Sequence, residues 1–207
     1  MTIRKLGVKF TLLTVVAVML LAGCAAGASG KTETKLKGED AQSESTEPNS
    51  SEDTFEEEAN PVAGVGLSGV TLTDYEGNEL KNVFANKKLT VLNLWGTFCG
   101  PCIDEMPELQ KLSEEYADKN VQVIGYAVDV EDDTYKEDAK SILEQTGATF
   151  DQIMSKGEIK ELIGSKFDYV PATLFVDENG KVLSTMIPGG TTYEDLERIV
   201  DKLLAES

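Results

Sequence analysis

The 207-residue sequence contains no histidine, only three cysteines and one tryptophan, and its 19 basic residues are outnumbered by 37 acidic ones. The lack of histidine and the shortage of cysteine leave too few residues for a structural zinc site, which normally takes four Cys or His ligands. A net charge of −18 opposes binding to nucleic acid, because an acidic surface repels phosphates. We expect no nucleic-acid partner, and we interpret the acidity as a solvated surface and tail.

The sequence also lacks a hydrophobic run long enough to cross a bilayer comfortably, which takes roughly 20 residues. The apolar run over residues 10–22 follows a basic start and ends in Leu-Ala-Gly-Cys24. This tetrapeptide resembles the lipobox of bacterial lipoproteins, which implies that residues 1–23 are a signal peptide and that Cys24 carries a lipid. The alternative is an ordinary signal peptide followed by a chance cysteine. We expect a lipid-anchored protein on the extracytoplasmic face of the cell membrane, in a monoderm bacterium.

Residues 24–62 are rich in Ser, Thr, Glu, Asp and Gly, and segments of this kind cannot bury enough apolar surface to fold. As a flexible coil, such a segment would span roughly 30–40 Å. We interpret it as an acidic, disordered tether between the lipid and a folded domain over residues 63–207.

Within residues 63–207, strand patterns alternate with helical ones, which is typical of an α/β sheet covered by helices on both faces. The strand at residues 89–95 is apolar throughout and should be central. The expected strands and hairpins are 70–73 with 79–80, 89–95, 121–128, and 172–176 with 181–185. The expected helices begin after Cys99, over about 134–145, and at Thr191 with Glu194 as capping partner. The buried stripe of the first helix should hold Ile103, Met106, Leu109, Leu112 and Tyr116, with Pro107 kinking it.

Cys99 and Cys102 form a C-x-x-C pair where the central strand meets the following helix. A cysteine at a helix N-terminus faces unpaired N–H groups and the positive end of the helix dipole, and both favour the thiolate. We expect Cys99 to attack a partner disulfide and Cys102, one turn deeper, to resolve the mixed disulfide. The predicted chemistry is thiol–disulfide exchange, with no cofactor or metal beyond the two cysteines.

Other uses of the motif fit less well. Haem attachment needs a histidine after the second cysteine, where Ile103 stands. A peroxiredoxin-type site would show Thr-x-x-Cys, but Thr97 is only two residues before Cys99. A purely structural disulfide across so short a loop stabilises little.

The chain from about residue 64 to residue 207 resembles the TlpA/ResA branch of the thioredoxin superfamily. The matching segments are Asn93-Leu-Trp-Gly-Thr-Phe-Cys-Gly-Pro-Cys102, Glu105-Met-Pro107, Val170-Pro-Ala-Thr173 and the turn Asp177-Glu-Asn-Gly180. The resemblance implies a thioredoxin-like fold with a central mixed sheet, an N-terminal β-hairpin and an insertion over about residues 131–152. It also implies a cis peptide bond before Pro171, and a substrate-binding surface that comprises Trp95, Phe98, Gly100, Pro101, Val170 and Pro171.

Two departures from thioredoxin itself concern the surroundings of the cysteines. Asn93 stands where thioredoxin has a buried aspartate, and Phe98 stands where most relatives have tryptophan before the first cysteine. Glu105 matches the glutamate of ResA-like sites and lies at i+3 from Cys102, so its carboxylate can share that helix face. The resemblance implies that Glu105 moves protons for Cys102. The alternative is a solvated first-turn glutamate favoured by the helix dipole.

The resemblance and the Gly-Pro dipeptide between the cysteines favour an extracytoplasmic reductase. Its clients would be exported proteins with disulfides, such as apocytochrome c in cytochrome c maturation, an exported methionine sulfoxide reductase or a sporulation protein. A membrane electron donor of the CcdA/DsbD kind would re-reduce it. One alternative is a disulfide-forming oxidase like DsbA, with a potential near −120 mV instead of about −270 mV. Another is a client-docking module that performs no redox turnover.

Overall fold

The computed structural model describes residues 59–85 and 87–207. The predicted signal peptide, Cys24 and most of the predicted tether lie outside these residues, so the expectations for them stay predictions. None of the helices in the described part combines the length and apolar character that a membrane span requires.

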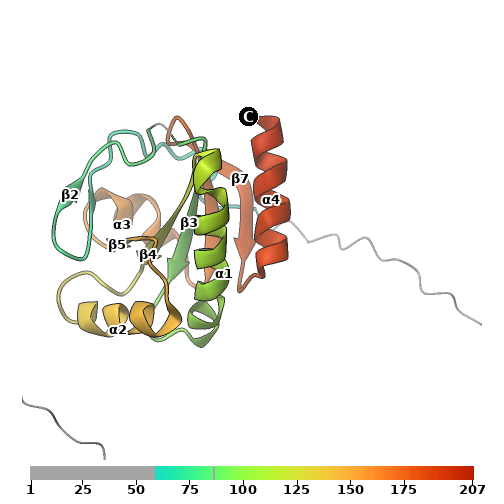
Figure 1. The fold of residues 1–207 in the computed structure, drawn as a ribbon. Helices are drawn as coiled ribbons and strands as arrows, with labels where there is room; N and C mark the ends of the chain where they lie inside the picture. Colours follow the sequence, from blue (N-terminus) through green and yellow to red (C-terminus); the bar gives the residue numbers. More distant parts are fainter. Residues whose placement is uncertain (1–58, 86) are drawn as a thin grey trace, which may run out of the picture. The chain divides into compact units, whose positions relative to one another are not determined.

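A five-stranded mixed sheet forms the centre of the domain, with β3 as its middle strand (Figure 1). One edge of β3 pairs in parallel with β4, which pairs in parallel with β5; the other edge pairs antiparallel with β6, which pairs antiparallel with β7. Every residue of β3 is buried, as predicted for a central strand covered on both faces. The strands of this sheet are β3 (Leu89–Trp95), β4 (Val121–Ala127), β5 (Asp151–Met154), β6 (Ala172–Asp177) and β7 (Val182–Pro188).

Alternate residues of β3 enter two separate clusters of buried side chains, because successive side chains of a strand point to opposite faces. Leu89 and Val91 pack on the face covered by α1, α2 and α4, whereas Leu92 and Leu94 pack on the face covered by α3. Figure 1 shows α1 and α4 side by side over the first face. The helices are α1 (Gly100–Tyr116), α2 (Lys136–Thr146), α3 (Glu158–Leu162) and α4 (Tyr193–Glu206), with short 3-10 turns η1 (Ala117–Lys119) and η2 (Gly164–Lys166). The predicted α/β architecture is confirmed.

The N-terminal segment of the domain also covers the second face, and it begins earlier than predicted. Asn60 donates from Nδ2 to the Leu183 carbonyl at 2.8 Å, and Val62 is buried in the core, although both fall within the predicted tether. The predicted N-terminal hairpin is present as β1 (Leu72–Thr73) and β2 (Glu79–Leu80), shorter than expected.

The insertion over residues 131–152 holds α2, which ends at Gly147 in the left-handed conformation as predicted. α2 is followed by β5 and α3, two elements that the sequence pattern does not predict. β5 is an edge strand with exposed Asp151 and half-buried Gln152, and α3 has only five residues, so neither carries a clear periodic signal.

Two details of the helices correct the predictions. Ile103 is half-buried, and Cys102 and Glu105 lie in the buried stripe of α1 in addition to the apolar residues. The N-cap of α4 is Thr192, whose hydroxyl accepts from Asp195 N–H, and not Thr191 with Glu194. The Thr191 N–H, one residue before the cap, donates to Glu105 Oε2.

Candidate active site

The two cysteines lie where β3 passes into α1. Cys99 is the N-cap of α1, and its sulfur accepts from the Cys102 N–H at 3.3 Å. The two sulfurs are joined in a disulfide, with 5.3 Å between the Cα atoms. Cys99 is 7% exposed whereas Cys102 is fully buried, so an incoming sulfur can reach Cys99 only. This order of exposure supports Cys99 as the attacking thiol in the reduced protein and Cys102 as the resolving thiol.

A groove of about 440 Å³ opens beside Cys99. Four of the predicted substrate-binding residues line it, namely Phe98, Gly100, Pro101 and Val170, and Val128, Phe167, Asp168 and Tyr169 complete it. The Val170–Pro171 bond is cis, as the resemblance implies, and the Val170 carbonyl oxygen lies 3.6 Å from the Cys99 sulfur. Pro171 itself is buried next to the groove wall. A client segment in this groove would therefore meet the Val170 backbone beside the reactive sulfur.

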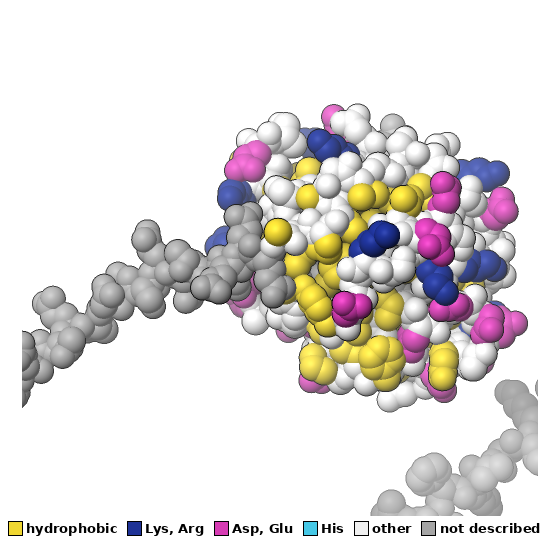
Figure 2. Space-filling model, turned by 180° about the vertical axis from the view of Figure 1, so that it is seen from behind, with side chains coloured by type: hydrophobic (Ala, Val, Ile, Leu, Met, Phe, Trp, Pro, Cys, Tyr) yellow, Lys and Arg dark blue, Asp and Glu magenta, His cyan; other side chains and the backbone are white. Residues whose placement is uncertain are grey.

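The groove wall is unusually aromatic for an exposed surface. Phe98 is 73% exposed and Tyr169 is 42% exposed, and the Tyr169 ring packs edge-on against Phe167. A Cβ on Gly96 would approach the Phe98 ring within 2.7 Å, so a larger residue there would require Phe98 to move. Figure 2 shows hydrophobic side chains gathered at the lower end of the domain, the end at which α1 begins in Figure 1. The sequence pattern did not single out Tyr169 and Phe167, which lie about seventy residues from the cysteines.

Trp95 does not belong to this surface. Its side chain is fully buried, and its indole N–H donates to Gln152 Oε1 at 3.0 Å. The prediction that Trp95 contacts substrate is therefore wrong for this structure. A strand residue whose side chain points inward cannot line a groove, and Trp95 instead belongs to the core beneath the α1 face of the sheet.

Glu105 lies three residues after Cys102 in the buried stripe of α1 and is only 3% exposed, so the alternative of a solvated first-turn glutamate is wrong. Its Oε1 accepts from Asn93 Nδ2 at 2.8 Å, and its Oε2 accepts from the Thr191 N–H at 2.9 Å. Asn93 also donates to Thr173 Oγ1 at 3.0 Å. The amide that replaces the aspartate of thioredoxin thus holds the carboxylate that α1 supplies.

Burial sets the acidity of Glu105. It raises the pKa of the carboxyl from 4.5 to about 7, although the hydrogen bonds from Asn93 and Thr191 act in the opposite direction. Near neutral pH the group therefore exists in both protonation states, as a proton donor and acceptor requires. Cys102, three residues earlier on the same helix face, is the nearest thiol along the chain.

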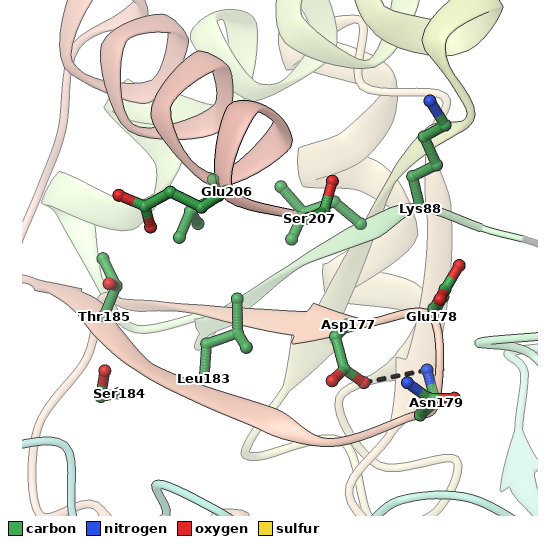
Figure 3. Close-up of a pocket in the computed structure, with 11 residues that line it drawn as sticks. Lys88, Asp177, Glu178, Asn179, Leu183, Ser184, Thr185, Glu206 and Ser207 are labelled. Atoms are coloured by element: carbon green, nitrogen blue, oxygen red, sulfur yellow. Dashed lines mark hydrogen bonds between the residues drawn. The ribbon is translucent and has the colours of Figure 1, made fainter.

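A second hollow, of about 590 Å³, lies at the opposite end of β3 (Figure 3). The C-terminal end of α4, the middle of β7 and the Asp177–Asn179 turn surround it, together with Lys88 just before β3. It contains no cysteine. Among the described residues there is also no group of three or more Cys, Asp or Glu side chains that could hold a metal ion. The groove at Cys99 is therefore the candidate active site.

Comparison with known proteins agrees with this geometry. Residues 58–203 match the model of the Redoxin family. The chain is 32% identical over 133 residues to a thiol-disulfide oxidoreductase ResA of Bacillus thuringiensis, a match that covers 64% of this chain and 73% of that protein. It is 30% identical over 149 residues to the ResA of Geobacillus kaustophilus, covering 72% of this chain and 82% of that protein.

Solved structures show the same fold. A putative thiol:disulfide interchange protein DsbE from Chlorobium tepidum superposes with a TM-score of 0.56 at 26% identity, over 69% of this chain and 97% of that chain. StoA from Bacillus subtilis superposes with a TM-score of 0.51 at 17% identity, over 63% of this chain and 94% of that chain. The thioredoxin-like fold is thereby established.

Proposed function

This chain belongs to the Redoxin family and to its ResA-like thiol–disulfide oxidoreductases, and we propose that it reduces disulfides of exported client proteins while anchored to a membrane. In one turnover Cys99 attacks a client sulfur, and a mixed disulfide forms as the other client sulfur leaves as a thiol. Cys102 then attacks Cys99, so the client leaves with two thiols and the protein keeps the Cys99–Cys102 disulfide. Two electrons and two protons pass to the client, and the cysteine pair needs no further cofactor.

The observation that carries this proposal is the graded exposure of the two sulfurs at the groove. Cys99 is reachable from a groove of about 440 Å³ that is bordered by the Val170 backbone, whereas Cys102 is fully buried. This geometry favours one order of attack. In the same turnover Glu105 accepts the proton of Cys102 when that thiol attacks, because its raised pKa lets it ionise and protonate near neutral pH.

The reductive direction is tested by the reduction potential of the Cys99–Cys102 pair, measured by equilibration with glutathione buffers. We expect a value near that of thioredoxin, about −270 mV, because the Gly-Pro dipeptide between the cysteines is the one found in reducing thioredoxins. A value near −120 mV would identify a disulfide-forming oxidase instead, since such proteins stabilise their reduced form.

We propose further that Cys24 carries the lipid that holds the domain at the extracytoplasmic face, and that a membrane protein of the CcdA/DsbD kind returns the disulfide to the dithiol. In this arrangement the acidic segment that follows Cys24 links the lipid to the domain.

Cys24→Ala should remove the protein from the membrane fraction, either as soluble protein or as an uncleaved precursor, while its insulin-disulfide reduction in solution stays at the wild-type rate. Lipidation supplies the membrane affinity, and the anchor takes no part in the chemistry. Fractionation with immunoblotting and a reductase assay measure the two effects. A disulfide between Cys24 and either Cys99 or Cys102 in the wild-type protein would contradict the assignment.

A further inference from the structure

Thr97 precedes Cys99 by two residues, and both of its hydrogen-bond donors are directed to one side chain, Asp129. The Thr97 N–H lies 3.1 and 3.2 Å from the two carboxylate oxygens, and Thr97 Oγ1 lies 2.5 Å from Oδ2. Asp129 stands on the loop that follows β4, thirty-two positions along the chain. The carboxylate therefore accepts hydrogen bonds from both the backbone and the side chain of Thr97.

Two backbone hydrogen bonds also hold the segment that joins β3 to α1. The Val128 N–H donates to the Trp95 carbonyl at 2.8 Å, and the Cys99 N–H donates to the Gly96 carbonyl at 3.1 Å. Together with the bonds to Asp129, these contacts give every residue from Trp95 to Cys99 except Phe98 a hydrogen bond that fixes the turn. Phe98 is free to project into the groove.

The charge of Asp129 also acts beyond its hydrogen bonds. Asp129 is half-buried, where solvent screens a charge less than at an open surface. Burial first, and the negative charge of Asp129 second, raise the pKa of Tyr75, whose hydroxyl is buried and has no hydrogen-bond partner among the described residues.

We propose that Asp129 is a positioning residue for the redox pair, which fixes the loop before Cys99 through Thr97 and, through its negative charge, disfavours the Cys99 thiolate. The positive end of α1 stabilises that thiolate, and Asp129 opposes it from the facing loop. A less stable thiolate makes the reduced form less stable, which lowers the reduction potential. The inference rests on thiol–disulfide exchange at Cys99 and does not depend on which clients are used or in which direction electrons flow.

Other titratable groups face the pair and must be held constant in a test. Glu105 lies beneath it on α1, Asp168 lines the groove, and Tyr75 faces Asp129 from the turn after β1. None of these donates to or accepts from Thr97. Replacing Asp129 alone therefore changes the frame of the loop and one charge, and leaves those groups in place.

The test is the pKa of the Cys99 thiol in the full-length reduced protein. It is obtained from the pH dependence of iodoacetamide alkylation, quantified by mass spectrometry on the peptide that contains Cys99. Asp129→Asn keeps an oxygen acceptor for Thr97 and removes the charge. We expect the Cys99 pKa to fall by about 0.5 unit. The equilibrium with glutathione should shift about threefold toward the reduced protein, which is about 14 mV at 29.6 mV per tenfold.

Two further variants separate charge from position. Asp132→Asn removes an exposed carboxylate from the same loop and should leave the Cys99 pKa unchanged. Thr97→Val removes the hydroxyl bond but keeps the charge, so the pKa should stay within about 0.2 unit while alkylation slows, and Thr97→Ser should restore the rate.

The proposal is overturned if Asp129→Asn folds and keeps the wild-type Cys99 pKa, because Asp129 is then a structural anchor only. It is also overturned if Thr97→Val shifts the pKa as far as Asp129→Asn does, because loop position and not charge then sets the acidity. A high reduction potential in the wild-type protein would contradict the proposed reductase but would leave the expected difference between wild type and Asp129→Asn intact.

Discussion

Replacing Cys99 with serine is expected to abolish insulin-disulfide reduction, to the rate of the uncatalysed reaction with the assay's thiol. Cys99 holds the only sulfur of the pair that reaches the groove, at 7% exposure, and a serine hydroxyl at this position does not exchange with disulfides. The fold should persist, because Ser is close to Cys in size and can still cap α1 by accepting from the residue 102 N–H.

The matched control is Ser113→Ala, which alters a hydroxyl on the same helix away from the cysteines and should leave the rate unchanged. Circular dichroism and thermal unfolding distinguish loss of chemistry from loss of fold. Retained reduction by a folded Cys99→Ser protein would favour the non-catalytic docking module. It would also remove the basis for assigning attack to this sulfur.

Glu105→Gln should slow turnover with client disulfides by about 100-fold, the low end of what a positioned general acid or base contributes. The change keeps the volume and removes the ionisable group whose pKa burial raises to about 7. We expect the titrations of Glu105 and Cys102 to be coupled in the reduced protein, so their apparent pKa values belong to the pair. Stopped-flow turnover and thiol titration from pH 5 to pH 9 measure both effects.

The same variant should also change the pH dependence of stability. Because the folded-state pKa of Glu105 is about 7 and its ordinary value is 4.5, the unfolded chain releases this proton first as the pH rises. The stabilisation is fully present below about pH 4.5 and is lost as the pH rises through about 7, by at most about 3 kcal/mol at 1.36 kcal/mol per pKa unit. Urea unfolding of the oxidised protein should show this decline in wild type and a flatter profile in Glu105→Gln.

Glu108→Gln is the control for both experiments, since it removes a carboxylate from the same helix outside the contacts to Asn93 and Thr191. If Glu105→Gln keeps the wild-type turnover, thiol titration and pH dependence of stability, the buried carboxylate takes no part in the chemistry. Its proposed role would then be withdrawn, whatever the behaviour of Cys99.

Much of this site follows from local sequence. The apolar run of β3 and the C-x-x-C pair before a helix each depend on a few neighbouring residues, and the structure confirms the strand and the helix. The cis bond before Pro171 is confirmed as well, but it was implied by the family resemblance and not by the Val-Pro pair alone. The residue pattern places Cys99 at an N-cap because a strand that ends at Trp95 leaves only a short turn before α1.

Long-range partnerships could not be predicted in the same way. From the sequence alone, Asn93 indicates only that the buried aspartate of thioredoxin is missing. Its role as a hydrogen-bond donor to Glu105 depends on how α1 packs against β3. Asp129 is one of many acidic residues in the sequence, and nothing nearby in the chain marks it as the partner of Thr97. Pairings of this kind depend on how the sheet and its loops meet in space.

Burial is also set by the whole fold and not by residue type. Trp95 is an aromatic residue close to the cysteines in the sequence, as a substrate contact could be. Its side chain, however, lies on the same face of β3 as Leu89 and Val91, which places it in the core. Val62 directly follows the polar segment of the predicted tether, but it lies in a cluster formed with residues of the sheet. Tyr169 reaches the groove only because the loop before Pro171 folds beside Cys99.

The central claim, that Cys99 attacks client disulfides and Cys102 releases them, is tested most directly by capturing the intermediate. Cys102→Ser should leave client proteins joined to Cys99 by a mixed disulfide, because the resolving sulfur is gone. Non-reducing electrophoresis of acid-quenched membranes and mass spectrometry identify the linked peptides, with Cys99→Ser/Cys102→Ser as the matched control. The account predicts exported, disulfide-containing clients linked through Cys99 in the single variant and none in the double variant. Capture of clients through Cys102 by Cys99→Ser, with none held by Cys102→Ser, would contradict it.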